Sequence, residues 1–424
     1  MFQIKKFKNI FLIYLLFLYF TAIYYLFLKH TGGSDSTISE WLVNYYGGFT
    51  RRGLSGYIFA QIAIFFDISI RFVIFVFQSF FYLIFLILIY YFFRNIKTNI
   101  LLYLCLFCPL LMTYHVAELE ILARKEILVF INFLFFLFLS LNINLKKYTN
   151  VYLFISIPIL LLIWEPIVFF LPFYIFILIN STNYKNYNSL IFSIFCIFSS
   201  SLVVIYFLLI NQYDVKNEIL MCSNLKELFD ERCYMSLVYL DTSIKENFDS
   251  LFRDVKIQHI FRYLLVYLIG FFPIIYLARN LKKKIIFKIK IFNNISIFHY
   301  IIICSIFLPI LYAMGLDWGR WINIHYFFIV CSIYFLIKKG NYFLNDNLSE
   351  KFKKVFYIKN KVILVSLFII FCFGWNPKTS LTGDIATNPI WKIPYNASKK
   401  IWGFDSLRLF QDSSFIKWHK KYIE

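Results

Sequence analysis

The stretch IFLIYLLFLYFTAIYYLFL, residues 10–28, contains no charged side chain. About 20 consecutive apolar residues in a helix cross the roughly 30 Å of hydrocarbon in a bilayer. Lys5, Lys6 and Lys8 precede this run, as in a secretory signal peptide. The run is longer than the roughly 7–15 residues of a signal-peptide core, and no small-residue cleavage site follows it. We therefore interpret it as a first membrane-spanning helix that stays in the protein.

Similar apolar runs recur along the whole chain of 424 residues, which is 61% hydrophobic and 16% charged. Soluble domains are about 25% charged. The composition predicts an all-α, polytopic helical membrane protein. We expect about eleven transmembrane spans, at residues 10–28, 70–93, 98–113, 127–143, 151–163, 167–180, 189–210, 261–278, 295–313, 324–337 and 361–375.

The formal net charge of +20 falls almost wholly on one set of loops. These loops hold 21 of the 43 Lys and Arg residues and only two of the 23 acids, in clusters at 5–8, 94–97, 146–147, 185, 279–290 and 338–361. Such a bias is typical of cytoplasmic loops, not of a surface that binds nucleic acid. It predicts a cytoplasmic N-terminus, a periplasmic C-terminus, and the inner membrane of a bacterium as the location.

This topology depends on a break in the apolar stretch 151–180. A single helix there would invert every later basic cluster. A turn at WEP, residues 164–166, keeps the clusters on one side, and Pro166 disfavours helix at Glu165.

The predicted domain organisation is a helical bundle, residues 1–375, followed by a periplasmic tail, residues 376–424. The bundle includes a first periplasmic loop, 29–69, and a large periplasmic loop, 211–260. Within the first loop, LSGYIFAQIAIFF (54–66) is too short to span and is expected to lie in the membrane interface. Cys222 and Cys233 fall in the large loop, where an oxidising compartment would allow a disulfide.

The predicted outside loops concentrate the ionisable residues in four motifs: NYYGGFTRRGLSG (44–56), ARKE (123–126), WEP (164–166) and DWGRW (317–321). Short loops stay near the ends of their helices, so we expect these groups to meet around one outward-facing cavity. The predicted spans hold no Asp or Glu, which argues against a proton-driven carrier.

Each motif also has a purely structural interpretation. Arg51 and Arg52 could anchor lipid headgroups, and ARKE could be a helix-end charge cluster. Glu165 could cap the next helix. Asp317 and Arg320 could pair to hold a tight turn.

Arginine, glycine and carboxylate side chains at a membrane surface suit glycosyl transfer from a lipid-linked sugar. Arginine binds phosphate oxygens in a bidentate way, and the turn at Gly47 and Gly48 could bring backbone N–H groups to the same anion. A carboxylate can take the proton of a sugar hydroxyl. The leaving phosphate or pyrophosphate requires fixed positive charge.

The four motifs together resemble integral-membrane proteins of bacterial surface-polysaccharide clusters, commonly assigned as O-antigen polymerases. The layout is also similar to the wider superfamily of membrane glycosyltransferases that use polyprenyl-linked donors. Those proteins keep an acidic residue in the first outside loop, followed by an interfacial helix. Asp35 and Glu40 match by position only, because this loop lacks an adjacent acidic pair.

The resemblance implies polymerisation of undecaprenyl-pyrophosphate-linked repeat units of O-antigen or capsule. In this interpretation Arg51 and Arg52 bind the leaving pyrophosphate, Arg124 and Arg320 assist, and Gly47, Gly48 and Glu165 support the site. The base is one of Asp35, Glu40, Glu118 and Asp317. No metal or cofactor is expected. The expected partners are the lipid-linked glycan, membrane lipids, and a chain-length regulator and flippase of the same pathway.

Two other functions use the same features. A polyprenyl-phosphate-sugar-dependent glycosyltransferase that decorates a surface glycan would need the same loops and a different acceptor. A polysaccharide flippase or exporter is the second alternative, and the absence of acidic residues from the predicted spans counts against it.

Overall fold

Helices form almost all of the regular structure in the computed structural model, which describes residues 2–95, 99–182, 187–210, 215–238, 240, 244–344, 360–380 and 386–387. Six segments within these ranges are long and apolar enough to cross a membrane: Phe7–Gly32, Ile70–Phe93, Lys146–Ile163, Glu165–Thr182, His259–Asn280 and Trp318–Lys339. The prediction of an all-α membrane protein is therefore confirmed at the level of fold class.

The six segments lie in the long helices of the bundle. These are α1 (Phe2–Gly32), α4 (Ile70–Phe93), η2 with α8 (Lys146–Tyr148, Thr149–Ile163), η3 with α9 (Glu165–Phe170, Leu171–Thr182), α13 (Ile257–Asn280) and α17 (Trp318–Lys339). The other helices are α2 (Ser36–Leu42), α3 (Gly53–Phe66), α5 (Ile100–Phe107), α6 (Tyr114–Ala117), η1 (Leu119–Ile121), α7 (Glu126–Leu141), α10 (Tyr187–Ile210), α11 (Val215–Phe229), η4 (Met235–Leu237), α12 (Ile244–Asp254), α14 (Ile291–Asn294), α15 (Ile297–Cys304), α16 (Leu308–Ala313) and α19 (Lys361–Phe373).

The centre of the bundle is α17, whose residues 319–336 are all buried. It packs against α7, α9 and α13. Phe328 lies between Phe133 and Phe170, with ring centroids 4.4 Å and 4.9 Å away. A helix that is buried on every side needs apolar side chains on every side, which the middle and end of α17 supply.

Proline breaks two of the predicted spans. Residues 98–113 contain only the eight-residue α5, which stops at Cys108 before Pro109. Residues 295–313 divide into α15 and α16 at a turn before Pro309. The residue before a proline disfavours helix, and irregular backbone is tolerated at membrane depth only where protein covers it. Cys108, Leu110, Leu111 and Met112 are indeed buried.

The chain also breaks at the WEP motif, as the sequence predicts. Helix α8 ends at Ile163, Trp164 is extended with φ −157° and ψ 90°, and η3 begins at Glu165. The two flanking segments are thus separate candidates to cross the membrane.

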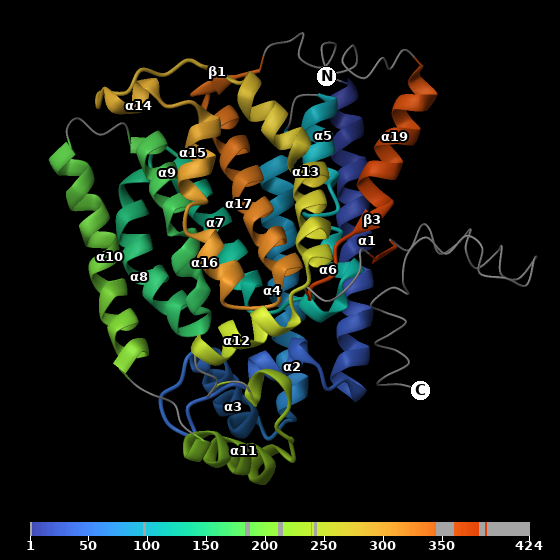
Figure 1. The fold of residues 1–424 in the computed structure, drawn as a ribbon, viewed down its shortest axis with the longest axis vertical. Coiled ribbons are helices and arrows are strands. Elements are labelled where there is room, and N and C mark those ends of the chain that lie inside the picture. The colour runs from blue at the N-terminus through green and yellow to red at the C-terminus, as the bar shows by residue number, and fades with distance from the viewer. Residues whose placement is uncertain are drawn as a thin grey trace, which may run out of the picture.

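The two ends of the bundle differ in character (Figure 1). The N-terminus of α1, strand β1 (Lys282–Lys283) and α14 lie at one end, where β1 pairs with β2 (Tyr342–Phe343). Helices α2, α3 and α11 lie at the opposite end. A second short pair, β3 (Trp375–Asn376) with β4 (Ala386–Thr387), follows α19. Most of the predicted tail, 381–385 and 388–424, lies outside the described residues.

Residues 215–238 and 240 form a cap over the first loop, which we call the α11 cap. The Gly47–Gly48 turn lies directly against it, because a Cβ at Gly47 would stand 2.0 Å from the carbonyl oxygen of Asn217. Arg71 forms an ion pair with Glu231, and the Ser236 N–H donates to Ser39 Oγ at 3.2 Å. A disulfide joins Cys222 to Cys233, whose Cα atoms are 5.6 Å apart.

We predict that replacing both cysteines, Cys222→Ser with Cys233→Ser, loosens the α11 cap by about 2–3 kcal/mol, the entropic worth of so short a closed loop. Limited proteolysis should cut the cap faster in this variant than in the wild-type protein. A reductant should speed cleavage of the wild type and leave the variant unchanged. Thiol labelling of both cysteines in non-reduced protein would contradict the disulfide.

Candidate functional site

Five segments that are far apart in the sequence bring charged side chains together at the α2–α3 end of the bundle. We call these eight residues the ion cluster: Glu40, Arg52, Arg124, Lys125, Glu126, Glu165, Asp317 and Arg320. They come from α2, the turn before α3, the turn into α7, the start of η3, and the start of α17. The convergence expected from the sequence is present for these groups.

Glu40 is the hub of the ion cluster and is completely buried. Arg124 grips both of its oxygens, with Nε–Oε2 at 3.0 Å and Nη2–Oε1 at 2.6 Å. Arg320 and Arg52 approach Oε1 at 3.3 Å and 3.5 Å. Burial alone would raise the pKa of the Glu40 carboxyl, but the three guanidinium groups together hold that pKa well below its ordinary value.

Arg320 links the hub to two further acids. Its Nη1 lies 3.0 Å from Glu126 Oε1, and its Nη2 lies 2.9 Å from Asp317 Oδ2. The guanidinium also stands 4.3 Å from the centre of the Trp321 ring, a favourable stacking of cation on aromatic face. The motif DWGRW thus contains the internal Asp–Arg pair that the structural interpretation expected, and it also reaches Glu40.

The main ion partner of Arg52 is Glu165. Its Nε and Nη2 donate to the Glu165 carboxylate at 2.7–3.0 Å in a bidentate pair. Arg52 immediately precedes α3 and has φ 64° and ψ 10°, a left-handed conformation that is unusual for a residue with a Cβ. Glu165 therefore has an ion partner across the bundle end rather than a capping role alone.

Exposure separates an inner from an outer part of the ion cluster. The side chains of Asp317, Glu165 and Arg52 are 34%, 24% and 20% exposed, whereas the other acids and arginines are nearly or fully buried. Arg51 is half-buried beside this outer part, and its Nη2 donates to the Leu240 carbonyl of the α11 cap at 3.4 Å. An incoming ligand would meet Asp317, Glu165, Arg52 and Arg51 first.

The charges within the ion cluster balance, with four cations and four carboxylates. Arg124 and Arg320 are already engaged with acids, so they could contact a phosphate only after rearrangement. Arg51 lies at the outer edge, where it donates to the Leu240 carbonyl of the α11 cap. Arg52 is engaged with Glu165 in the same way, but Arg51 and Arg52 are more exposed than Arg124 and Arg320, so an anion from solvent would reach them first.

Two of the four candidate bases lie outside the ion cluster. Asp35 is buried, caps α2 by accepting from the Thr37 N–H at 3.0 Å, and pairs with the buried Lys29. Glu118 accepts from the Thr379 N–H at 2.8 Å and lies 3.4 Å from Lys378 Nζ. Burial raises the pKa of the Glu118 carboxyl to about 7, despite that lysine.

The glycine turn has a packing role in the structure. Gly48 has φ 116°, a conformation that favours glycine. Its N–H donates to the Tyr45 carbonyl at 3.0 Å, so that group is engaged within the turn. The need for glycine at 47 comes from the closeness of the α11 cap.

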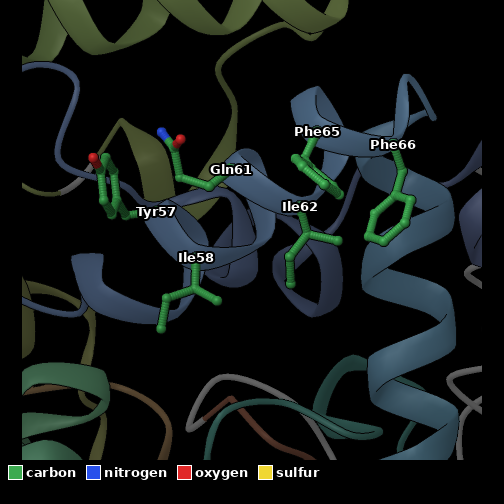
Figure 2. A pocket seen from close by; sticks show the side chains of 6 residues that line it. All are labelled: Tyr57, Ile58, Gln61, Ile62, Phe65 and Phe66. Atoms are coloured by element: carbon green, nitrogen blue, oxygen red, sulfur yellow. The ribbon is translucent and has the colours of Figure 1, made fainter.

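Helix α3 extends from Arg52 with one buried face and one exposed apolar face. Gly53, Gly56, Ala60 and Ala63 are buried, and the small side chains let the helix approach the bundle closely. A shallow pocket of about 310 Å³ lies on the outer face. Figure 2 shows the side chains that line it: Tyr57, Ile58, Gln61, Ile62, Phe65 and Phe66. This surface fits the predicted interfacial helix at 54–66.

Three lysines near this end are buried, and the sequence predicted neither Lys29 nor Lys378 as part of a site, while Lys125 was expected only as a member of the ARKE motif. Lys29 lies one residue beyond the predicted first span and holds Asp35. Lys125 donates to the Arg52 carbonyl, and Lys378 pairs with Glu118. No spacing rule connects these partners. Among the residues described, no group of three or more His, Cys, Asp or Glu side chains is placed to hold a metal ion.

Comparison with known proteins adds nothing to this picture, since no family model, no curated protein and no solved structure matches the chain.

We predict that Glu40→Gln lowers the stability of the protein by about 3–5 kcal/mol, because it leaves buried guanidinium groups without their countercharge. Thermal unfolding in detergent would measure the loss. Asp317→Asn is the matched control, since Asp317 meets the same Arg320 but is one-third exposed, and we expect a loss of about 1 kcal/mol or less. Equal losses in the two variants would contradict the hub role of Glu40.

A second prediction concerns Glu118 and pH. The folded protein holds the proton of this carboxyl more tightly than the unfolded chain, since its pKa is raised from 4.5 to about 7. The Glu118 carboxyl therefore contributes fully to the free energy of unfolding below pH 4.5. This contribution, on the order of 3 kcal/mol, is lost as the pH rises to about 7. Glu118→Gln should flatten this decline in unfolding midpoint between pH 5 and 7. If the unfolding midpoint of the variant falls with pH as steeply as that of the wild type, the raised pKa of Glu118 is contradicted.

Proposed function

We propose that the chain is a glycosyltransferase that polymerises undecaprenyl-pyrophosphate-linked repeat units of O-antigen or capsule. The reaction would take place at the periplasmic face of the inner membrane of a bacterium. The observation that carries this proposal is the outer edge of the ion cluster at the end of a membrane bundle, where the partly exposed Arg52 and Asp317 are linked through Glu40 and Arg320. Pyrophosphate binding and proton removal need a cation and a carboxylate within one site.

The proposed reaction uses Asp317 as the base. Asp317 accepts the proton of an acceptor sugar hydroxyl, and that oxygen forms a new bond to C1 of the donor sugar. The bond between C1 and the pyrophosphate oxygen breaks, and the electron pair leaves with undecaprenyl pyrophosphate. Arg51 and Arg52 stabilise this leaving group. Arg320 holds Asp317 in place at 2.9 Å.

The geometry favours Asp317 over the other candidate bases. Glu40 is fully buried among three arginines, and Asp35 caps α2 while paired to Lys29. Glu118 is buried behind Lys378 and Thr379. Asp317 is one-third exposed, so a sugar hydroxyl could reach it without rearrangement.

The exposed apolar face of α3 supports a lipid-linked substrate. Helix α3 begins directly after Arg52 and runs for 14 residues, a length of about 21 Å, and its pocket lies along residues 57–66. A phosphate bound by Arg51 and Arg52 would therefore leave its hydrocarbon chain beside an apolar surface.

This proposal includes about eleven crossings, with the N-terminus in the cytoplasm and the C-terminus in the periplasm. We predict that reporter fusions after Lys147, Lys185, Lys290 and Lys354 report the cytoplasm. Fusions within 211–260 and 376–424 should report the periplasm. A cytoplasmic result for 211–260 would put the ion cluster on the wrong side for this reaction.

The experiment that tests the function combines gene deletion with point variants, read on a gel of the surface polysaccharide. Deletion should remove the polysaccharide ladder, and the intact gene should restore it. We predict that Arg51→Lys shortens the ladder, because lysine keeps the charge but loses the bidentate grip. One such interaction is worth about 2–4 kcal/mol at the transition state, or roughly 30- to 1000-fold in rate.

The matched control is Arg253→Lys, on the exposed surface of α12, which should give a full ladder. Membrane levels of all variants should match the wild type. A full-length ladder with Arg51→Lys would favour the headgroup-anchor interpretation of this arginine. A deletion strain that keeps its ladder and loses one sugar substituent would indicate a decorating transferase instead.

A further inference from the structure

Lys125 is a buried cation for which the proposed reaction has no use. Its side chain is completely buried between the ARKE turn and the first loop. Its Nζ donates to the backbone carbonyl of Arg52, and it lies 5.9 Å from the centre of the Trp41 ring. Burying a lysine is costly unless its ammonium group is hydrogen-bonded. The Arg52 carbonyl supplies that hydrogen bond, which suggests that the contact has a role.

The Arg52 backbone needs such a partner. Its φ of 64° is left-handed, and an L-residue with a Cβ adopts this conformation only where its surroundings enforce it. Gly53 follows directly and leaves no room for a Cβ, which would stand 2.2 Å from the Tyr45 ring. The turn into α3 is therefore tightly constrained at this point.

Arg52 is thus held at its backbone and at its side chain by different loops, in addition to its contact with Glu40. Lys125, from the turn into α7, fixes the carbonyl, and Glu165, from the WEP turn, grips the guanidinium. The carbonyl contact is made to the backbone of the same left-handed residue, and that backbone conformation sets where the guanidinium can reach.

We propose that Lys125 is the positioning residue for Arg52, which it holds through the backbone carbonyl so that the guanidinium stays at the outer edge of the ion cluster. The consequence for phosphate binding rests on the proposed function, whereas the positioning itself does not. Glu40, Glu126, Glu165 and Arg52 are the charged groups that act on the lysine. Burial lowers the pKa of Lys125 to about 7, and both the amine and the ammonium have an N–H to donate.

The first test is a stability cycle that does not depend on activity. Thermal unfolding in detergent is compared for the wild type, Lys125→Met, Arg52→Ala and the double variant. If Lys125 positions Arg52, then Arg52→Ala lowers the unfolding midpoint by less than half as much in the Lys125→Met background as in the wild type. Equal shifts in both backgrounds would overturn the proposal.

Two further variants complete this test. Lys125→Arg keeps a buried donor. In this background, Arg52→Ala should again lower the unfolding midpoint as much as it does in the wild type. If Lys125→Met does not fold, Lys125→Gln replaces it, since its amide is polar but too short to reach the carbonyl. Lys339→Met is the control, because Lys339 donates to the Ser140 carbonyl at the other end of the bundle and should leave the Arg52→Ala shift unchanged.

The second test measures binding of undecaprenyl phosphate to the same purified variants. Lys125→Met should weaken binding about tenfold, the worth of one charge-assisted hydrogen bond, with no additional loss in the Arg52→Ala background. An equal loss in both backgrounds would mean that Lys125 contacts the phosphate itself, and would overturn the positioning role. If the stability cycle shows coupling but neither variant alters lipid binding, the positioning stands and the phosphate role of Arg52 falls.

Discussion

The buried carboxylate of Glu40 is the constraint on which the outer end of this protein depends. One side chain with no exposure accepts contacts from Arg52, Arg124 and Arg320, which lie 12, 84 and 280 residues further along the chain. A buried ion pair adds little net stability because both partners lose their water, but removing one partner is costly. The arrangement therefore fixes geometry: the first loop, the ARKE turn and the start of α17 can meet in one way.

This constraint explains why the site has an inner and an outer part. The inner arginines form ion pairs with Glu40 and Glu126, and these ion pairs hold the loops together. The outer groups, Arg52, Glu165 and Asp317, are anchored by the inner ones yet reach solvent. Charged groups that are both exposed and rigidly held are what the proposed reaction requires. The apolar face of α3 begins at the same place, where the chain leaves Arg52.

The sequence was sufficient for the fold class and for the convergence of the four motifs, but it also predicted Asp35 and Glu118 at the site, which lie outside the ion cluster, and it was insufficient for the partners of these groups. Apolar runs and the WEP break are local signals, so they could be read directly. The division of α15 from α16 depends on Pro309 and was missed because the apolar run continues across it. The pairing of Arg52 with Glu165, and of Glu118 with Lys378, joins residues 113 and 260 apart. Only packing of the whole bundle decides which acid becomes a hub and which stays exposed.

The most direct test of the account is the reaction itself, with purified protein and undecaprenyl-pyrophosphate-linked repeat units as the only substrate. A polymerase should release undecaprenyl pyrophosphate together with lipid-linked products of two or more repeat units. Folded Asp317→Asn protein should yield neither. Lipid-linked units that remain unchanged in the presence of folded wild-type protein would contradict the central claim.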